Sequence, residues 1–486
     1  MFGTRDADTA ESQGLKRSAT RLLSVLLTIR LRELRPCREF RCRLLTPGVQ
    51  AIMRTKSISA SPLFALMLKT ATVNVAVMVA NALGMIICAR VLGAESRGVL
   101  AAWMIWPPIL AAILVVGMNS SFIFHAKNDA SSYKKYVSAL LVAAGILSIV
   151  GALIMWFATP YLYESQPEKT PGLQVWMAAF AFAMTLFTLL SGISQTTQNL
   201  TLYNATRLLP PFLYLALALA MSTVSKLNTL NFLAMYITGY LVAAFALAYS
   251  AICDIRKDFR FELPALKKLA THGSKFWCID FMAVLSAQLD KMFLVAFLAP
   301  NVVGVYAVAY GFSRILTQIQ LAIATVIFPH AAGKEISVVS LQVSLAFRIS
   351  TVGSVVLAFI AIALGKFAII ILYGSQYADA YPIFAVLVVE SIVSGGGWIL
   401  SQAFNAIGRT EIIVLRQIVG AIITCVLMYF LTPELGAIGV AISLLIGALL
   451  RFIVTVGAFS TLLGIKTPRL LLNGQDLKYL LSRLGK

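Results

Sequence analysis

About twelve long apolar segments separated by short gaps run from about Leu63 to Leu463, and this pattern constrains the fold more than any other feature. Of the 486 residues, 59% are hydrophobic and 12% are charged, whereas an average soluble chain carries about 25% charge. Too little polar sequence remains to cover this apolar surface in water, but in a bilayer the surplus faces lipid. A membrane span needs about 20 mostly apolar residues. Because unpaired backbone groups find no water in lipid, and strand-like alternation is lacking, the sequence predicts an all-α membrane protein.

Charged residues gather in every second gap between the apolar segments. On one side, which includes both termini, basic residues exceed acidic ones by 19, and on the other side the two balance. Basic residues mark the cytoplasmic side of a membrane protein. We therefore expect about twelve transmembrane helices with both termini in the cytoplasm, at 68–92, 99–126, 136–158, 173–195, 206–224, 229–252, 273–299, 301–330, 343–370, 378–405, 410–431 and 434–463.

A weak internal repeat divides these spans into two halves. The segment RVLGAESRGVLAA aligns with AFLAPNVVGVYAV at a constant offset of 206 residues, which pairs Gly98 with Gly304. The constant offset favours duplication, although chance similarity between apolar segments also explains it. Six spans per half give both halves the same orientation, as in transporters built from parallel repeats. The sequence thus predicts two six-helix lobes, an N-lobe at 61–255 and a C-lobe at 273–463, joined by a cytoplasmic linker at 256–272.

The two ends of the chain are basic. A tail at 464–486 is expected in the cytoplasm, and the segment 1–60 contains a run of arginines from Arg30 to Arg43. One interpretation of the N-terminal segment is an amphipathic helix on anionic lipid. The other, which we favour, is that the segment is disordered or that Met53 is the true start.

Motifs for catalysis, cofactors and metals are lacking in the sequence. The six cysteines show no CxxC pairing, the three histidines lie at span ends, and no phosphate-binding loop or nucleophile motif occurs. The gaps on the outer side are at most about 15 residues long, so they leave no room for an extracytoplasmic domain. We expect no enzyme activity, no cofactor, no metal site and no nucleic-acid partner.

Polar and ionisable residues inside the spans are the candidate site residues. Each charged one costs about 2.5–3.5 kcal/mol at a helix centre, so it is expected to face a wet cavity or a partner. They form buried ion pairs that join helices, such as Asp290 with Arg314, or they line a polar, partly cationic cavity between the lobes. Arginine suits phosphate because its fork bonds two oxygens at once. The substrate-binding candidates are Lys69, Asn74, Asn81, Gln288, Lys291, Arg314, Gln318, Gln402 and Arg451, and the candidates for coupling or ion pairing are Asp280, Asp290 and Glu390.

Three helix breakers are expected to interrupt spans. Pro107-Pro108, Pro210-Pro211 and Gly395-Gly396-Gly397 fall within the second, fifth and tenth spans. Such sequences allow either hinges or static bends.

Several segments together show a family resemblance. These are ARVLGAESRGVLAA with the following GMNSSF, AQLDKMFLVAFLAPNVVGVYAVA, FPHAA, LYGSQYADAYPIFAVL and NAIGRT. In this order and with twelve spans, the chain resembles the polysaccharide-biosynthesis flippases of the MOP exporter superfamily. The resemblance implies two six-helix bundles around a central cavity and alternating access. It also implies transport of undecaprenyl-diphosphate-linked oligosaccharides across the bacterial inner membrane for O-antigen, capsule or exopolysaccharide.

The expected partners are therefore a lipid-linked oligosaccharide, membrane lipids and other polysaccharide-assembly proteins. Two alternatives stay open. A drug or cation antiporter of the same superfamily would need acidic residues to dominate the cavity. A membrane polysaccharide polymerase or ligase would need a long extracytoplasmic loop, which the short outer gaps disfavour.

Overall fold

The computed structural model describes residues 60–163, 171–196, 200–222, 227–256, 258–331, 336–407 and 409–461. The chain divides into two compact units, Met1–Leu66 and Met67–Lys486, and the second contains the helix packing and the cavities of the protein. The basic segments predicted at 1–60 and 464–486, with the alternative start at Met53, fall outside the described residues except for Ala60.

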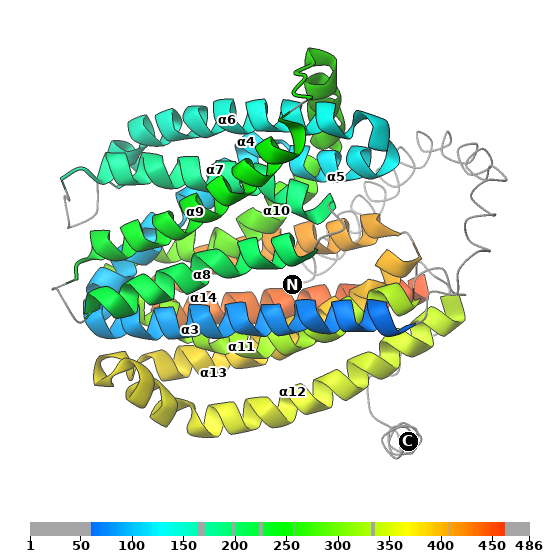
Figure 1. Ribbon diagram of the computed structural model, residues 1–486. Coiled ribbons are helices and arrows are strands. Elements are labelled where there is room, and N and C mark those ends of the chain that lie inside the picture. Colours follow the sequence, from blue (N-terminus) through cyan, green and yellow to red (C-terminus); the bar gives the residue numbers. More distant parts are fainter. Residues whose placement is uncertain are drawn as a thin grey trace, which may run out of the picture. The chain divides into compact units, whose positions relative to one another are not determined.

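The described ranges are helical and contain no strand, as the sequence predicts. Short 3-10 turns, η2 (Ala130–Ser132) and η3 (Ser375–Tyr377), join some of the helices. The α-helices are, in chain order, α3 (Ala60–Trp103), α4 (Trp106–Val115), α5 (Met118–Asn128), α6 (Tyr133–Leu162), α7 (Leu173–Thr196), α8 (Leu200–Ser222), α9 (Thr229–Ile255), α10 (Leu263–Phe297), α11 (Pro300–Ala331), α12 (Ile336–Tyr373), α13 (Ala380–Ala406) and α14 (Thr410–Thr461) (Figure 1).

Many helices are long and apolar enough to cross a membrane. By length and composition, seven stretches of the described residues qualify, within α3–α4, α6, α7, α9, α12, α13 and α14. Large apolar side chains on these helices are open to the surroundings; Phe157, Phe359 and Phe367 are 68%, 77% and 69% exposed. A helix face of this kind suits lipid, not water. Helices α8, α10 and α11 are not among the seven stretches, and each carries charged residues within its length.

Kinks split two of the longest helices. Helix α14 covers two predicted spans, and α3 covers the first predicted span and the start of the second. In α3, Gly93 has φ 76° and ψ 176°, a conformation that side chains with a Cβ atom rarely adopt. In α14 the kink is at Gly436. The predicted second span is broken twice, before α4, where Pro107 and Pro108 begin the helix, and at Val116 and Gly117, before α5.

The other two predicted interruptions do not end a helix. Pro210 and Pro211 lie inside α8, and the glycines from Gly395 to Gly397 lie inside α13, and both helices continue through them. Close packing accounts for glycine at these positions. A Cβ atom on Gly396, for example, would lie 2.8 Å from the Phe347 ring of α12. The glycines permit close packing of α13 against its neighbours.

Two sets of helices pack mainly among themselves. In the first set α7 contacts α4, α5, α6, α8 and α9, and in the second α13 contacts α11, α12 and α14. Helix α3 contributes to both cores, since Leu100 and Trp103 pack in the first set, while Ala89 and Ala101 pack in the second. Helix α10 contacts α14 of the second set and α4, α5 and α6 of the first. This arrangement agrees with two six-helix lobes, with α3 and α10 between them.

The paired glycines of the internal repeat meet at a helix crossing between α3 and α11. A Cβ atom on Gly98 would overlap the carbonyl oxygen of Pro300, and one on Gly304 would overlap the carbonyl oxygen of Ala94. Pro300 lies 206 residues after Ala94, so the two contacts are equivalent under the sequence repeat. Reciprocal contacts between repeat-related positions are those of a local two-fold arrangement, which supports duplication.

Further contacts close the same end of the molecule. Arg90 donates hydrogen bonds to the carbonyl oxygens of Leu372, at 2.6 Å, and Ile371. The hydroxyl of Tyr377 donates to the carbonyl oxygen of Ala89 at 3.0 Å. The charge count assigns these gaps to the outer side, so α3 seals the predicted outer end against α11, α12 and η3.

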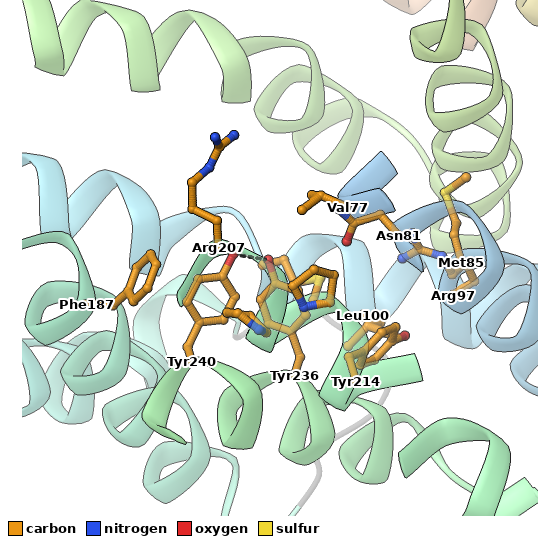
Figure 2. A pocket seen from close by; sticks show the side chains of 13 residues that line it. Val77, Asn81, Met85, Arg97, Leu100, Phe187, Arg207, Tyr214, Tyr236 and Tyr240 are labelled. Atoms are coloured by element: carbon orange, nitrogen blue, oxygen red, sulfur yellow. Dashed lines mark hydrogen bonds between the residues drawn. The ribbon is translucent and has the colours of Figure 1, made fainter. Parts of the chain in front are cut away.

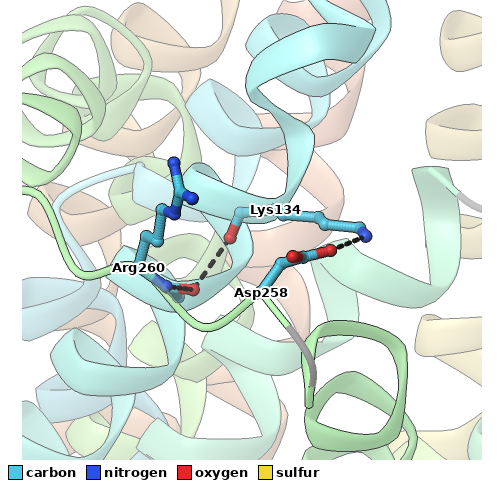
Figure 3. A network of polar contacts seen from close by, with 4 residues as sticks. Lys134, Asp258 and Arg260 are labelled. Carbon is cyan, nitrogen blue, oxygen red and sulfur yellow. Dashed lines mark hydrogen bonds and ion pairs between the residues drawn. The ribbon is translucent and has the colours of Figure 1, made fainter.

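At the opposite end, charged gaps meet as the charge count predicts. Lys134, at the start of α6, forms an ion pair of 2.5 Å with Asp258 (Figure 3), and Lys135 forms one of 2.8 Å with Glu262. The hydrogen bond from Lys134 and its charge hold the pKa of Asp258 below its ordinary value. Helix α10 begins at Leu263, earlier than the predicted span at 273, because charged residues in its first turns hide its continuation from hydropathy.

Candidate functional site

A cavity of about 360 Å³ lies among α3, α7, α8 and α9. Its polar lining consists of two arginines, an amide and three tyrosine rings. Figure 2 shows Asn81, Met85 and Arg97 on one side of it and Phe187 and Tyr240 on the other. The polar lining residues are Asn81, Arg97, Arg207, Tyr214, Tyr236 and Tyr240.

The aromatic wall of this cavity is a connected cluster of rings. Tyr236 packs edge-on against Tyr214, with ring centroids 5.9 Å apart, and lies 5.0 Å from Tyr240. The hydroxyl of Tyr236 donates to that of Tyr240 at 3.3 Å. Rings with attached hydroxyls offer flat apolar faces and hydrogen bonds together, which suits sugar rings and other amphipathic ligands.

Arg97 joins this cavity to the second set of helices. Its charge acts on Tyr214 and Tyr236, and also on Lys291 of α10. Its Nε atom is buried and has no hydrogen-bond partner among the described residues. The neighbouring wall residue Met85 packs on α11, since a Cβ atom on Gly311 would overlap it. A guanidinium with a buried, unused Nε donor next to a cavity is a candidate anion ligand.

A row of cations continues from Arg97 into the second set of helices. Lys291 and Arg314 lie over the same ring, that of Tyr310, at 5.6 Å and 4.4 Å from its centroid. Lys291 also donates to Gln288 at 2.9 Å. Arg314 forms an ion pair of 3.0 Å with the buried carboxylate of Glu390.

Two arginines of α14 extend the row. The charge of Arg451 interacts with those of Arg314 and Glu390, and Arg416 interacts with Arg451. Arg416 is buried and donates to the carbonyl oxygen of Gly397 at 3.1 Å. The five cations Arg97, Lys291, Arg314, Arg416 and Arg451 thus accompany two buried carboxylates, Asp290 and Glu390, which leaves the region positive.

The structure changes the predicted ion pair. Arg314 pairs with Glu390 and not with Asp290, which accepts a hydrogen bond of 2.8 Å from Tyr306. Asp290 and Tyr306 are both almost fully buried, at 2% and 1% exposure. Adjacent residues on a helix point about 100° apart, so Asp290 and Lys291 face different neighbours.

Other predicted residues lie apart from this row or have structural roles. Asn74 has a buried side-chain oxygen without a partner in the described ranges, and Gln318 is exposed. Gln402 donates to the carbonyl oxygen of Trp398, and Asp280 accepts a hydrogen bond of 3.1 Å from Ser120. The side chain of Lys69 lies outside the described residues.

Sequence reasoning missed Arg97, Arg207 and the three tyrosines. The charge count places both arginines in gaps between spans, as ordinary loop charges. Both arginines lie within two residues of a predicted span end, and this was the one feature of the sequence that could have marked them as site residues. The tyrosines give no signal, because aromatic residues are common in membrane helices.

Comparison with known proteins gives a family and a fold. A profile of the family described as polysaccharide biosynthesis protein matches residues 67–333. No curated protein matches the chain significantly in sequence. A structure of the lipid II flippase MurJ in an inward closed conformation has a TM-score of 0.67 at 13% identity, covering 82% of this chain and 88% of that one.

Transporter structures are also similar. An inward-facing multidrug resistance MATE family transporter of the MOP superfamily has a TM-score of 0.63 at 16% identity, covering 79% of this chain and 96% of that one. An outward-facing MATE structure has a TM-score of 0.54 at 17% identity, covering 79% and 94%. At such low identity the likeness shows a shared fold, which confirms the predicted MOP-type architecture. The proteins in these structures are a flippase and transporters, not enzymes.

Proposed function

Because the chain belongs to the polysaccharide biosynthesis protein family, we propose that it moves a prenyl-diphosphate-linked oligosaccharide across the bacterial inner membrane. The observation that carries this proposal is the row of partly buried cations from Arg97 through Lys291 and Arg314 to Arg451, next to a tyrosine-lined cavity. A diphosphate supplies the anionic oxygens that such a row would bind, and a short glycan supplies rings and hydroxyls for the tyrosines.

The residues divide into roles by chemistry. Arg314 and Arg451 would hold the diphosphate because a guanidinium fork bonds two oxygens at once, with Lys291 as a point charge beside them. Asn81 and Tyr240 would bond sugar hydroxyls in the cavity. The prenyl chain would stay in lipid, since transfer of its apolar surface into a polar cavity is unfavourable.

Arg314 would exchange partners when the cargo binds. Its guanidinium is paired with Glu390, and a diphosphate that takes over this guanidinium leaves a buried carboxylate without its cation. Glu390 is therefore the candidate coupling residue of this pair.

The closed outer end supports alternating access. Contacts of Arg90 and the crossing of Gly98 and Gly304 seal the predicted outer side, so the cargo would enter from the cytoplasmic side. Loading and release would then need these contacts to open in turn with contacts at the other end.

The test is export of glycan in a deletion strain complemented by single variants. Arg314→Ala and Arg451→Ala are expected to reduce export at least tenfold and to leave complete lipid-linked repeat units on the cytoplasmic leaflet, with the protein still in the membrane. Arg314→Lys is expected to recover little, because an ammonium lacks the fork.

Arg409→Ala is the matched control, because Arg409 is exposed just before α14 and lies outside the row. It is expected to export normally. Normal export by the Arg314→Ala, Arg451→Ala double variant would remove the cation row from the proposal.

A cation antiporter is the second candidate, on the ground of the fold shared with MATE transporters. It receives less support, because Asp290 and Glu390 are already partnered by Tyr306 and Arg314. Resistance to cationic dyes on overexpression, with unchanged lipid-linked glycans in the deletion strain, would favour it.

A further inference from the structure

A second cavity, of about 480 Å³, lies at the end of the molecule where α5 ends and α10 begins. One face of the first turns of α10 forms most of its wall. The spacing of three and four residues along α10 places these side chains on one face. Besides Pro264, the lining consists of His125 on α5, with Lys267, Lys268, Thr271, His272 and Lys275 on α10.

Carboxylates neutralise little of this positive charge. Asp258 and Glu262, which precede α10, each form an ion pair with a lysine of α6, at N···O distances of 2.5 and 2.8 Å. Asp129 acts electrostatically on His125 and Lys268, but it also accepts hydrogen bonds from Ser131 and Ser132. Lys267 and Lys275 are exposed and form no ion pair within the described ranges. Three lysines therefore face one carboxylate.

Hydrogen-bond donors in the cavity are available and held in place. The rings of His125 and His272 lie 4.8 Å apart, and Nε2 of the first and Nδ1 of the second are buried without a partner among the described residues. Lys268 is fixed by a 2.8 Å hydrogen bond to Tyr136 and lies 5.4 Å from that ring's centroid. An ammonium has three donors, so two N–H groups of Lys268 stay free for a ligand.

An apolar rim adjoins the lysines. Phe259, Phe261 and Leu263, just before the first turn of α10, are 56%, 43% and 66% exposed. Basic residues next to exposed aromatic and aliphatic side chains are typical of segments that lie in the interface of an anionic membrane. A small soluble anion has no apolar part that could contact this rim, whereas a phospholipid has acyl chains that can.

We propose that this cavity binds the phosphate of an anionic phospholipid headgroup on the predicted cytoplasmic leaflet. Lys267 and Lys275 attract the phosphate, Lys268 and the histidine pair bond its oxygens, and the rim contacts the start of the acyl chains. None of these residues lines the central cavity or belongs to the cation row, so the proposal does not rest on the proposed function.

The headgroup would join α10 to the first set of helices. Close to His272, a Cβ atom on Gly273 would lie 2.6 Å from the carbonyl oxygen of Val116, so α10 touches the α4–α5 break directly beside the cavity. A phosphate held by His125 of α5 and by the lysines of α10 joins both sides of that contact.

Native mass spectrometry of the purified full chain tests the proposal. Dioleoyl-phosphatidylglycerol and dioleoyl-phosphatidylcholine are titrated separately, and the apparent Kd of the first bound lipid is measured for each. The wild type is expected to prefer phosphatidylglycerol. Lys267→Gln, Lys275→Gln is expected to weaken phosphatidylglycerol binding by about fivefold for each lysine, with no effect on phosphatidylcholine.

The matched control is Lys366→Gln, Arg409→Gln, which removes two exposed charges away from the cavity and is expected to leave both affinities unchanged. Equal phosphatidylglycerol affinity in the two double variants would overturn the site. If the first double variant proves unstable, Lys267→Gln alone takes its place in the same comparison.

Inorganic phosphate distinguishes the source of the anion. Calorimetric titration of phosphate into the wild type in a phosphate-free detergent buffer is expected to show no saturable binding at millimolar concentration. Saturable phosphate binding that Lys267→Gln, Lys275→Gln removes, together with no preference for phosphatidylglycerol, would overturn the lipid assignment in favour of a soluble phosphate.

Discussion

At the scale of single residues, Arg314 shows how one side chain connects stability and the proposed transport. Its guanidinium lies 4.4 Å from the centroid of the Tyr310 ring and 3.0 Å from the Glu390 carboxylate. Both contacts compensate a partly buried charge, whereas an isolated arginine in a membrane helix would have no such partners. The same contacts hold the guanidinium in a fixed direction beside Lys291.

Removal of one partner of this pair is therefore expected to cost more than removal of both. Glu390→Leu leaves the partly buried charge of Arg314 unpaired, and a loss of about 3 kcal/mol, the lower end for a broken buried pair, is expected. The Arg314→Met, Glu390→Leu double variant is expected to recover most of this loss. Thermal unfolding of the protein in detergent gives the double-mutant cycle, and a Tm for Glu390→Leu equal to that of the wild type would contradict the buried pair.

At the scale of elements, the crossing of α3 and α11 depends on two residues without side chains. Gly98 and Gly304 let the two backbones approach until a Cβ atom on either would overlap a carbonyl oxygen of the other helix. Small residues permit such close helix contacts in membranes. The crossing lies at the predicted outer end, where we expect it to limit access to the cavity lined by Asn81.

A methyl group at this crossing is expected to open the outer end. Gly98→Ala pushes α3 from α11, so Asn81→Cys in the central cavity becomes several-fold more reactive toward a membrane-impermeant thiol reagent added from outside. The measurement uses a background without the native cysteines. Gly353→Ala serves as the control, because no atom lies within 4 Å of its added Cβ. Labelling unchanged by Gly98→Ala, with the protein intact, would show that the crossing does not gate access.

At the scale of the whole molecule, the charge of the gaps between spans predicts the orientation in the membrane, and the packing of the helices positions the residues of the candidate site. The gaps that the charge count places on one side do meet, as the pairs Lys134–Asp258 and Lys135–Glu262 show. The outer contacts of Arg90 with Leu372 join gaps of the other side. Which side faces the cytoplasm follows only from the excess of basic residues.

Reporter fusions test this orientation. Alkaline phosphatase is active only outside the cytoplasm, so a fusion within 164–170 is expected to be active, and one within 256–262 inactive. Green fluorescent protein at the same two positions is expected to give the opposite pattern. Activity at 256–262 would reverse the assigned topology and with it the leaflet of the proposed lipid site.

The sequence by itself determined the helices, their approximate number, the membrane class and the pairing of Gly98 with Gly304. These features depend on sums along the chain, such as apolar length and loop charge, and on alignment of the chain with itself. Helix breaks were predicted less well, because proline and glycine bend a helix only when its neighbours allow it.

Only the tertiary structure decided which side chains meet. By sequence, either Asp290 or Glu390 could pair with Arg314. In the fold, the packing of α11 against α13 places Glu390 beside Arg314, and Asp290 accepts a hydrogen bond from Tyr306 instead. By sequence, Arg97 was interpreted as a charge in a loop, whereas in the fold it lines a cavity. Partner choice depends on how helices rotate and cross in three dimensions, and one-dimensional hydropathy contains no information about that rotation.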